Sequence, residues 1–121
     1  MRLDGKTVVC LLDTGCDVTL VPQSVVSATR GLKVTPCIEH LEAANGTQIM
    51  VTGKVTLPFR LHGRRIKTRA SVSPDVDGTM LGADWLGEHR CTWNFVNSTI
   101  TIDGSAPVSY THLTLPTKRI V

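Results

Sequence analysis

One segment of the sequence places an acidic side chain where it can do chemistry. Leu11-Leu12-Asp13-Thr14-Gly15 joins an apolar run to a carboxylate and then to a glycine, which permits a tight turn. An acid at the end of such a strand is partly desolvated and presented on a loop. In general, burial of a carboxyl group raises its pKa, and a second carboxylate within a few ångströms raises the pKa of one member further. Two such groups share one proton and titrate as a pair.

Two carboxyl groups with one shared proton can hydrolyse an amide by general acid–base catalysis. The ionised member takes a proton from water, and the protonated member supplies one to the carbonyl oxygen. Asp-Thr-Gly occurs once in the chain, so the pair can arise only from two chains related by a two-fold axis. On this interpretation Asp13 is the catalytic acid, the Thr14 hydroxyl bonds across the axis, and Gly15 lets a substrate backbone approach closely. A lone Asp-Thr-Gly is also typical of an ordinary turn.

The elements around this motif are predicted to be strands and hairpins. Residues 6–12 indicate a strand entered through the Asp4-Gly5 turn. Two hairpins are predicted, 38–44 with 47–51 around Asn45-Gly46 and 54–61 with 64–72 around His62-Gly63. Short strands at 79–82 and 99–102, a weak helical turn after Pro22 and a short helix at 83–89 complete the pattern. The expected fold class is all-β, a small closed barrel-like domain with one short C-terminal helix.

Length and composition fit a single small domain with an aliphatic core. The 121 residues are 41% hydrophobic but only 4% aromatic, which favours strands rich in Val, Leu and Ile. No run approaches the roughly 18 apolar residues of a membrane span, and the N-terminus lacks an apolar signal-peptide core. We therefore expect no membrane partner and a cytoplasmic location. The four cysteines lack zinc-ligand spacing, so we expect buried free thiols, no metal site and no cofactor.

Residues 107–121 differ in character from the rest of the chain. They contain two prolines, no acidic residue and no sustained period of two or 3.6. The segment also resembles a peptide produced when sequencing-adapter DNA is read through as coding sequence. We expect a domain over residues 1–106, with a truncated N-terminal strand, and a non-native or disordered tail over 107–121. The alternative is a genuine extended C-terminal strand.

Three segments together resemble the retropepsin family, the aspartic proteases of long-terminal-repeat retrotransposons and retroviruses. They are Leu12-Asp13-Thr14-Gly15-Cys16-Asp17, Ala44-Asn45-Gly46-Thr47 and Met80-Leu81-Gly82-Ala83-Asp84-Trp85-Leu86, in the family's order. The resemblance covers about residues 5–104 and implies a homodimer with one cleft. It also implies two flaps that close over an extended peptide, and cleavage of a retroelement polyprotein in the cytoplasm or within retroelement particles.

The resemblance also assigns residues to the substrate. It implies that Asp17 hydrogen-bonds the substrate backbone, and that the flap tip contacts it through Ala44, Asn45 and Gly46. Cys16 and Leu81 are further expected contacts. Cys16 replaces the small Ala or Ser usual after the motif glycine, which is a mild steric change. Ala83 stands where many retroviral members carry an arginine that pairs with the acid at position 17, and this version of the segment fits the retrotransposon branch better.

Alternative interpretations remain for several features. Asn45-Gly46 can be a plain surface hairpin, and Trp85 and Leu86 are expected in the core or a dimer contact. The basic residues Arg60, Arg64, Arg65, Lys67 and Arg69 alternate with apolar ones, which favours a solvated face over nucleic-acid contact because no aromatic is interleaved for base stacking. A catalytically idle dimerisation or peptide-binding module is the alternative function, and a basic nucleic-acid-binding domain is the third.

Overall fold

The computed structural model describes the chain except residues 14–15, 43–45, 62, 113–116 and 121. The described chain is mostly β-structure. Two short helices are present, α1 (Gln23–Ala28) and α2 (Ala83–Glu88). The strands are β1 (Arg2–Leu3), β2 (Lys6–Thr7), β3 (Cys10–Asp13), β4 (Leu20–Pro22), β5 (Thr35–Glu42), β6 (Gln48–Leu61), β7 (Arg64–Ser73), β8 (Thr79–Leu81), β9 (Cys91–Asn94), β10 (Thr99–Ile102), β11 (Val108–His112) and β12 (Thr117–Ile120).

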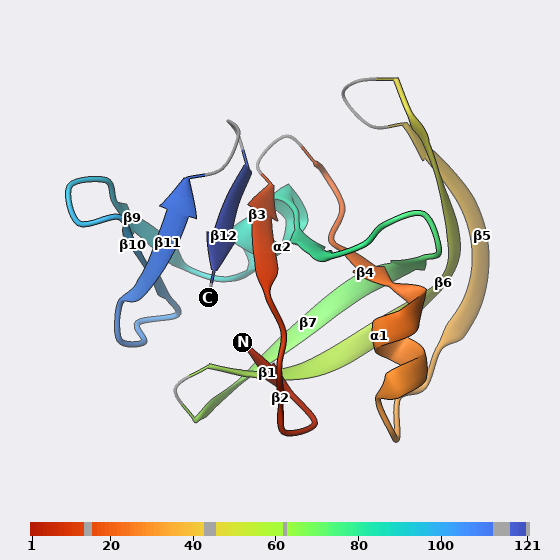
Figure 1. Ribbon diagram of the computed structural model, residues 1–121, viewed down its shortest axis with the longest axis horizontal. Coiled ribbons are helices and arrows are strands. Elements are labelled where there is room, and N and C mark those ends of the chain that lie inside the picture. Colours follow the sequence, from red (N-terminus) through yellow and green to blue (C-terminus); the bar gives the residue numbers. More distant parts are fainter. Residues whose placement is uncertain (14–15, 43–45, 62, 113–116, 121) are drawn as a thin grey trace.

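The strands form one curled sheet, like half of a barrel (Figure 1). Its order is β2-β1-β6-β7-β4-β8-β3-β12-β11-β10-β9, with β5 paired to β6 outside this path. The longest pairing is antiparallel, between β6 and β7, from Gly53 opposite Val72 to Leu61 opposite Arg64. In Figure 1 the long strands β5 and β6 rise at the right of the view. The small all-β class predicted from the sequence is confirmed.

The core follows the period-two pattern of the strands. Along β6 the side chains of Val55, Leu57, Phe59 and Leu61 are buried, while the residues between them are exposed. The main apolar cluster also takes in β3, β8, β10 and Trp85 of α2. A second, smaller cluster has Leu20, Val51 and Val76 as its buried members. Asp13, the first residue of the predicted catalytic motif, ends β3, a strand that contributes Cys10 and Leu12 to the main cluster.

The predicted strand over residues 6–12 is divided in the structure into β2, which pairs with β1, and β3, which pairs with β8 and β12. The helical turn predicted after Pro22 is confirmed as α1, a second helix beside the single one that the predicted fold class contained. Strand β9 was not predicted. It pairs in register with β10, from Asn94 opposite Thr99 to Cys91 opposite Ile102, and its short mixed sequence carries little periodic signal.

The segment predicted to lie outside the native fold contributes two strands to the sheet. β11 pairs with β10, and β12 lies between β11 and β3, with Thr117 opposite Asp13 and Ile120 opposite Cys10. Val108–His112 and Thr117–Ile120 lie in these strands, and β12 satisfies the backbone groups along one edge of β3. The division of the chain into a domain over residues 1–106 and a tail stays a prediction. The adapter-derived origin of residues 107–121 stays a prediction, which the genomic DNA around the stop codon tests.

All four cysteines are free thiols, as predicted, but only Cys10 is fully buried, and Cys16, Cys37 and Cys91 are half-buried. Burial raises the pKa of the Cys10 thiol to about 11, so it behaves as a small apolar side chain. No described helix is long and apolar enough to cross a membrane. The described residues contain no group of His, Cys, Asp and Glu side chains arranged to hold a metal ion.

Candidate active site

Asp13 is the last residue of β3 and is half-buried. Its strand lies parallel to β8, with Leu12 opposite Leu81, and is flanked on the other side by β12. Leu12 is completely buried beside it. The short apolar strand therefore fixes the position of the carboxylate at the boundary between the core and solvent, as the sequence predicted. Thr14 and Gly15, the other two predicted catalytic residues, lie outside the described residues.

Cys16 follows the motif and closes a turn onto Asp13. Its backbone N–H donates to the Asp13 carbonyl oxygen at 3.2 Å, and its thiol donates to the Val18 carbonyl oxygen at 3.0 Å. Partial burial raises the pKa of the Cys16 thiol, and the nearby carboxylates of Asp13, Asp84 and Asp17 raise it further. A thiol with a raised pKa stays protonated and can act as a hydrogen-bond donor to the loop.

The start of α2 packs directly against this loop. The Ala83 N–H donates to the Cys16 carbonyl oxygen at 2.7 Å, and the Asp84 N–H donates to the Asp17 carbonyl oxygen at 3.2 Å. Gly82 permits this approach, because a Cβ at that position would lie only 2.7 Å from the carbonyl oxygens of both Cys16 and Val18. The glycine before α2 is therefore required by close backbone packing.

The Asp84 carboxylate holds the same loop through Thr19. Oδ1 accepts a hydrogen bond from the Thr19 hydroxyl at 2.7 Å, and Oδ2 accepts from the Thr19 backbone N–H at 3.2 Å. Oδ1 also accepts from the Trp85 N–H, and the Thr19 hydroxyl accepts from the Gly82 N–H at 3.1 Å. Sequence analysis missed this pair. An acid in the first turn of a helix is an available signal, since such residues often satisfy free N–H groups, but its partner in a distant loop is not visible in the sequence.

The remaining predicted site residues fall in three different environments. Asp17 is exposed beside the loop, and Gly46 is exposed near the tip of the β5–β6 hairpin, with a positive φ of 85°. Ala44 and Asn45 lie outside the described residues. Leu81 is completely buried in the main core, because alternation along β8 turns it inward. Its role as a substrate contact stays a prediction.

The small apolar cluster adjoins this loop below the β5–β6 hairpin. Its partly buried members are Cys16, Leu41, Ile49 and Met80. They come from the loop after β3, from both arms of the hairpin and from β8, so the cluster joins the three segments singled out in the sequence. Met80 is the neighbour of Leu81 that points to this side. It was quoted in a motif but was not assigned a contact.

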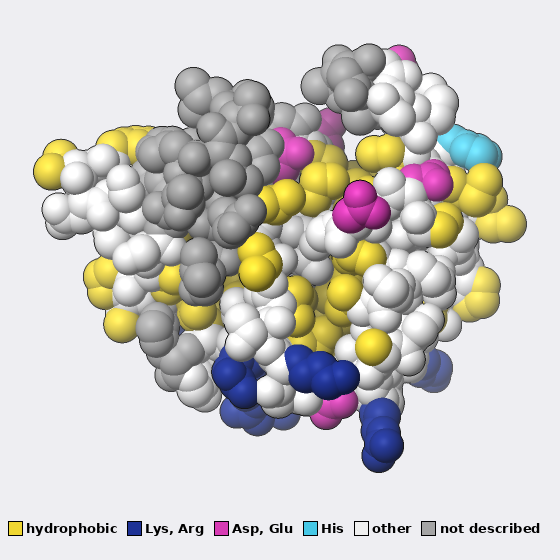
Figure 2. Space-filling view, viewed as in Figure 1, with side chains coloured by type: hydrophobic (Ala, Val, Ile, Leu, Met, Phe, Trp, Pro, Cys, Tyr) yellow, Lys and Arg dark blue, Asp and Glu magenta, His cyan; other side chains and the backbone are white. Residues whose placement is uncertain are grey.

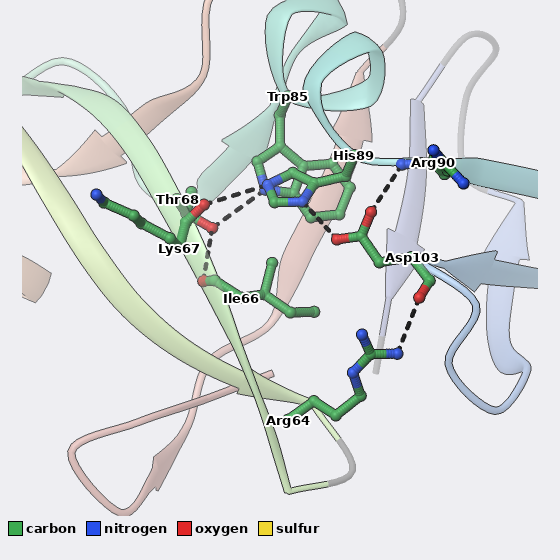
Figure 3. Close-up of polar contacts among 8 residues, drawn as sticks. All are labelled: Arg64, Ile66, Lys67, Thr68, Trp85, His89, Arg90 and Asp103. Atoms are coloured by element: carbon green, nitrogen blue, oxygen red, sulfur yellow. Dashed lines mark hydrogen bonds and ion pairs between the residues drawn. The ribbon is translucent and has the colours of Figure 1, made fainter.

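The far side of α2 is anchored by the polar contacts in Figure 3. The Trp85 indole N–H donates to the Thr68 hydroxyl at 3.1 Å, and its ring lies 4.7 Å from the His89 ring. His89 Nδ1 lies 2.7 Å from Oδ2 of Asp103, and its Nε2 lies 3.2 Å from the Lys67 carbonyl oxygen. These contacts fix α2 on β7 and on the end of β10, and so fix the surface that supports the loop.

Asp103 is held by two further donors. The Arg90 backbone N–H donates to the carboxylate Oδ1 at 2.9 Å, and the Arg64 guanidinium donates to the backbone carbonyl oxygen of Asp103 at 2.8 Å. Partial burial acts to raise the pKa of Asp103, but the hydrogen bonds from His89 and from the Arg90 backbone N–H, together with the positive charges of His89 and Arg64, hold it below its usual value.

A hollow of about 450 Å³ adjoins the loop and α2. It is lined by Val18, Asp84 and residues of β6 and β7, among others.

The comparisons with known proteins agree with this geometry. A family model described as aspartyl protease matches residues 1–85, which includes Asp13, the hairpin and the start of α2. This chain belongs to the aspartyl protease family. A comparison with curated protein sequences finds no match.

Two solved structures resemble this aspartyl protease family member in fold. The retroviral protease-like domain of Ddi1 from Leishmania major superposes with a TM-score of 0.72 at 18% identity, covering 94% of this chain and 92% of that one. EIAV protease, complexed with the inhibitor HBY-793, superposes with a TM-score of 0.52 at 22% identity, covering 68% of this chain and 84% of that one. At these identities the likeness establishes the retroviral protease-like fold.

Proposed function

We propose that the chain is one subunit of a homodimeric aspartic endopeptidase that cleaves the polyprotein of a retroelement. The observation that carries the proposal is the placement of Asp13, half-buried at the end of β3 and followed by a loop that α2 holds through Thr19 and Asp84. A carboxylate needs fixed geometry to work as a general acid or base. The family match supplies the class of reaction.

The chemistry follows from two copies of Asp13 that face each other across a two-fold axis. Carboxyl groups at such a distance cannot both be ionised, so the pair holds one proton. The ionised group takes a proton from water, which attacks the peptide carbonyl carbon, while the protonated group gives its proton to the carbonyl oxygen. In this proposal the Thr14 hydroxyls bond across the axis to keep the carboxylates coplanar, and Gly15 leaves room for the substrate backbone.

The substrate is an extended peptide lying between the loop and the β5–β6 hairpin. Asp17 is exposed beside the loop, where it can bond the peptide backbone, and the tip residues Ala44, Asn45 and Gly46 close over it. Met80 takes the place of Leu81 as the side chain of β8 that contacts the peptide. The small apolar cluster supports a preference for large apolar residues next to the cleaved bond.

The retroelement source rests on the sequence of the segment around α2. Gly82-Ala83-Asp84-Trp85-Leu86 is similar to the retrotransposon branch of retropepsins, and a cytoplasmic location, or one within retroelement particles, follows from that source. In this chain Ala83 stands where many retroviral members carry an arginine, so it offers no charged side chain to the loop. The neighbouring Asp84 holds the loop instead, through its hydrogen bond with Thr19. A reverse transcriptase reading frame downstream in the same transcript is the expected finding, and its absence would contradict this part of the proposal.

The Asp13→Asn variant tests the enzyme assignment. We expect the purified wild-type protein to cleave members of a peptide library at mildly acidic pH and the variant to cleave none, because an amide cannot replace the carboxylate in proton transfer. Asp77→Asn, which changes an exposed acid away from the loop, is the matched control and should retain activity. Equal cleavage by wild type and Asp13→Asn would overturn the proposal.

A catalytically idle dimerisation or peptide-binding module is the second candidate. It is favoured by one observation, that the fold superposes on a domain described as retroviral protease-like with a higher TM-score than on EIAV protease. The two candidates differ in the products of the peptide-library experiment. An idle module binds extended peptides with equal affinity in wild type and Asp13→Asn, and releases no fragments.

A further inference from the structure

The outer face of the β6–β7 pair carries a continuous group of basic side chains, here called the basic face. Residues directly opposite each other on antiparallel strands share a face, and the register places Arg60 opposite Arg65, Pro58 opposite Lys67 and Thr56 opposite Arg69. All of these side chains are exposed. On the neighbouring strand β1, Arg2 lies opposite Arg60. The basic face comprises Arg2, Lys54, Arg60, Arg65, Lys67 and Arg69.

The register brings like charges directly together. Arg2, Arg60 and Arg65 stand side by side on three neighbouring strands, an arrangement that destabilises a sheet unless an anion lies between the charges. In the described part of the chain, Lys54 with Glu39 is the one ion pair formed by a residue of this face. Arg60, Arg65, Lys67 and Arg69 take part in none. Their charges therefore remain available to a ligand.

Two described hollows are lined in part by residues of the basic face. The larger, of about 450 Å³, includes Lys33, Lys54 and Arg69, and the smaller, of about 260 Å³, includes Arg2, Arg60 and Arg65. One acid lines each hollow. Asp84 lines the first but is engaged by Thr19, and Asp4 lines the second. Lys67 stands on the strand between them, so positive charge runs from one hollow to the other.

Charge is also unevenly distributed on the face drawn in Figure 2. There the dark blue Lys and Arg side chains gather in the lower part of the view, while the magenta Asp and Glu side chains lie mainly in the upper part, toward the end of β3 and the β5–β6 hairpin. Such a separation attracts a polyanion to the lower part of this face.

We propose that the basic face binds the phosphodiester backbone of a nucleic acid. Arg65, Lys67 and Arg69 alternate along β7, so their Cα atoms are spaced by about 6.8 Å in a line, which suits a ligand with charges repeated along a chain. Guanidinium groups also match phosphate oxygens in geometry. No aromatic side chain belongs to the face, so bases have nothing on which to stack. The binding is consequently independent of base sequence.

The observations favour a nucleic acid over an acidic peptide. Extended peptides are commonly bound by an open strand edge or by pockets for alternate side chains. The charges of this face instead project from the surface of the β6–β7 pair, whose strands pair further with β5 over Gln48–Lys54, with β1 at Arg60 and with β4 over Ser71–Ser73. The sequence alone favoured a solvated face, because alternation does not reveal which cations stand opposite one another. The cross-strand register supplies that information.

Fluorescence anisotropy with a labelled oligouridylate and a labelled oligothymidylate, over a series of salt concentrations, tests the proposal. The Asp13→Asn protein is used throughout, so the result does not depend on proteolytic activity. We expect both probes to bind, with the logarithm of the binding constant falling steeply against the logarithm of salt concentration. The double variant Arg65→Gln/Lys67→Gln should flatten that slope by about 1.4, since each lost phosphate contact on a single strand removes about 0.7.

The matched control is Arg30→Gln/Arg90→Gln, which removes the same charge from exposed positions outside the basic face. It should leave the slope unchanged, and circular dichroism verifies that both variants keep the β-structure. Three results would overturn the proposal. The first is a reduction of the salt slope in the control equal to that in Arg65→Gln/Lys67→Gln. The second is a salt slope near zero for the protein with an unaltered basic face. The third is binding of labelled poly-glutamate as tight as that of the oligonucleotides, which would identify an acidic peptide as the ligand.

Discussion

The hydroxyl of Thr19 donates a 2.7 Å hydrogen bond to Oδ1 of Asp84, although the two residues are 65 positions apart in the sequence. This contact connects the loop that follows Asp13 to the helix that follows β8. The helix is in turn fixed on β7 and β10 by Trp85 and His89. The position of the Asp13 carboxylate is therefore determined by a chain of contacts that extends far beyond its own strand.

Loss of the Asp84 carboxylate should affect turnover more than binding. In Asp84→Ala the Thr19 hydroxyl and N–H lose their acceptor, which costs about 2 kcal/mol of stability for hydrogen bonds to a charged group. A loop displaced by a fraction of an ångström should lower kcat by about 10- to 100-fold, with KM changed much less. Steady-state kinetics on a cleaved peptide measure both constants.

Asp84→Asn and Glu88→Ala are the controls for this prediction. The asparagine keeps one acceptor for the Thr19 hydroxyl, so it should recover part of kcat, whereas Glu88→Ala removes an exposed acid from the same helix and should change neither constant. A purely structural role for Asp84 would instead lower the amount of folded protein and leave kcat per folded dimer at the wild-type value.

Two glycines near α2 should respond in opposite directions to alanine. Gly82→Ala places a Cβ against the carbonyl oxygens of Cys16 and Val18, and we expect a loss of at least about 1–3 kcal/mol in the free energy of unfolding. Gly87 lies within α2 and has no atom near its Cβ position. Gly87→Ala should add up to about 1 kcal/mol through helix propensity. Urea unfolding of both variants provides the comparison, and equal effects would contradict the close packing at Gly82.

Neighbouring residues of β8 should separate substrate preference from stability. Leu81→Ala empties a fully buried position and should cost about 2–5 kcal/mol of stability. Met80→Ala alters a partly exposed side chain of the small apolar cluster, so it should be less destabilising but should lower kcat/KM for peptides with large apolar residues at the cleaved bond. Peptide profiles and thermal unfolding of the two variants test this. If the Met80→Ala profile matches that of wild type, the reassignment from Leu81 to Met80 is wrong.

Acid stability should depend on Asp103. Its pKa in the folded protein lies below the usual value, so the carboxylate stabilises the fold above the unfolded-state pKa, about 3.9 for a model Asp. That contribution is lost as pH falls through the folded pKa, because the protonated group no longer accepts two charge-assisted bonds. The unfolding temperature Tm, measured between about pH 5 and pH 2, should therefore fall less steeply with decreasing pH for Asp103→Asn than for wild type. An unchanged decline would mean that the contacts with His89 and Arg90 do not persist in solution.

Much of the fold was predictable because the sequence carries its local signals. Alternation in 54–61 and 64–72 matches β6 and β7, and the strand ending at Asp13 was recognised from its apolar run and the following turn. α1 was predicted only as a weak helical turn, and β9 was not predicted. Both are short, and their residues have mixed propensities. Strands β11 and β12 were given only as an alternative, because their sequence has no sustained period. Their strand structure depends on pairing with β10 and β3.

The candidate site was predictable only where a residue carries its own motif. Asp13 belongs to Asp-Thr-Gly, and Gly46 to a hairpin turn. Thr19 and Asp84 have no joint signal, because their relation exists only once β3 and β8 pair in parallel. Leu81 and Met80 are equally apolar in the sequence, and the register of β8 decides which one faces the core. The pairing of Arg60 with Arg65 likewise becomes visible only in the sheet.

The proposal of one active site from two chains is tested most directly by mixing wild-type protein with inactive Asp13→Asn protein. The two are unfolded together and refolded in varied proportions, and activity is measured against the fraction of wild type. If each site needs an Asp13 from both chains, activity follows the square of that fraction, so an equal mixture retains a quarter of the wild-type activity. A linear dependence, with half of the activity at an equal mixture, would show that a single chain is sufficient and would contradict the paired-carboxylate mechanism.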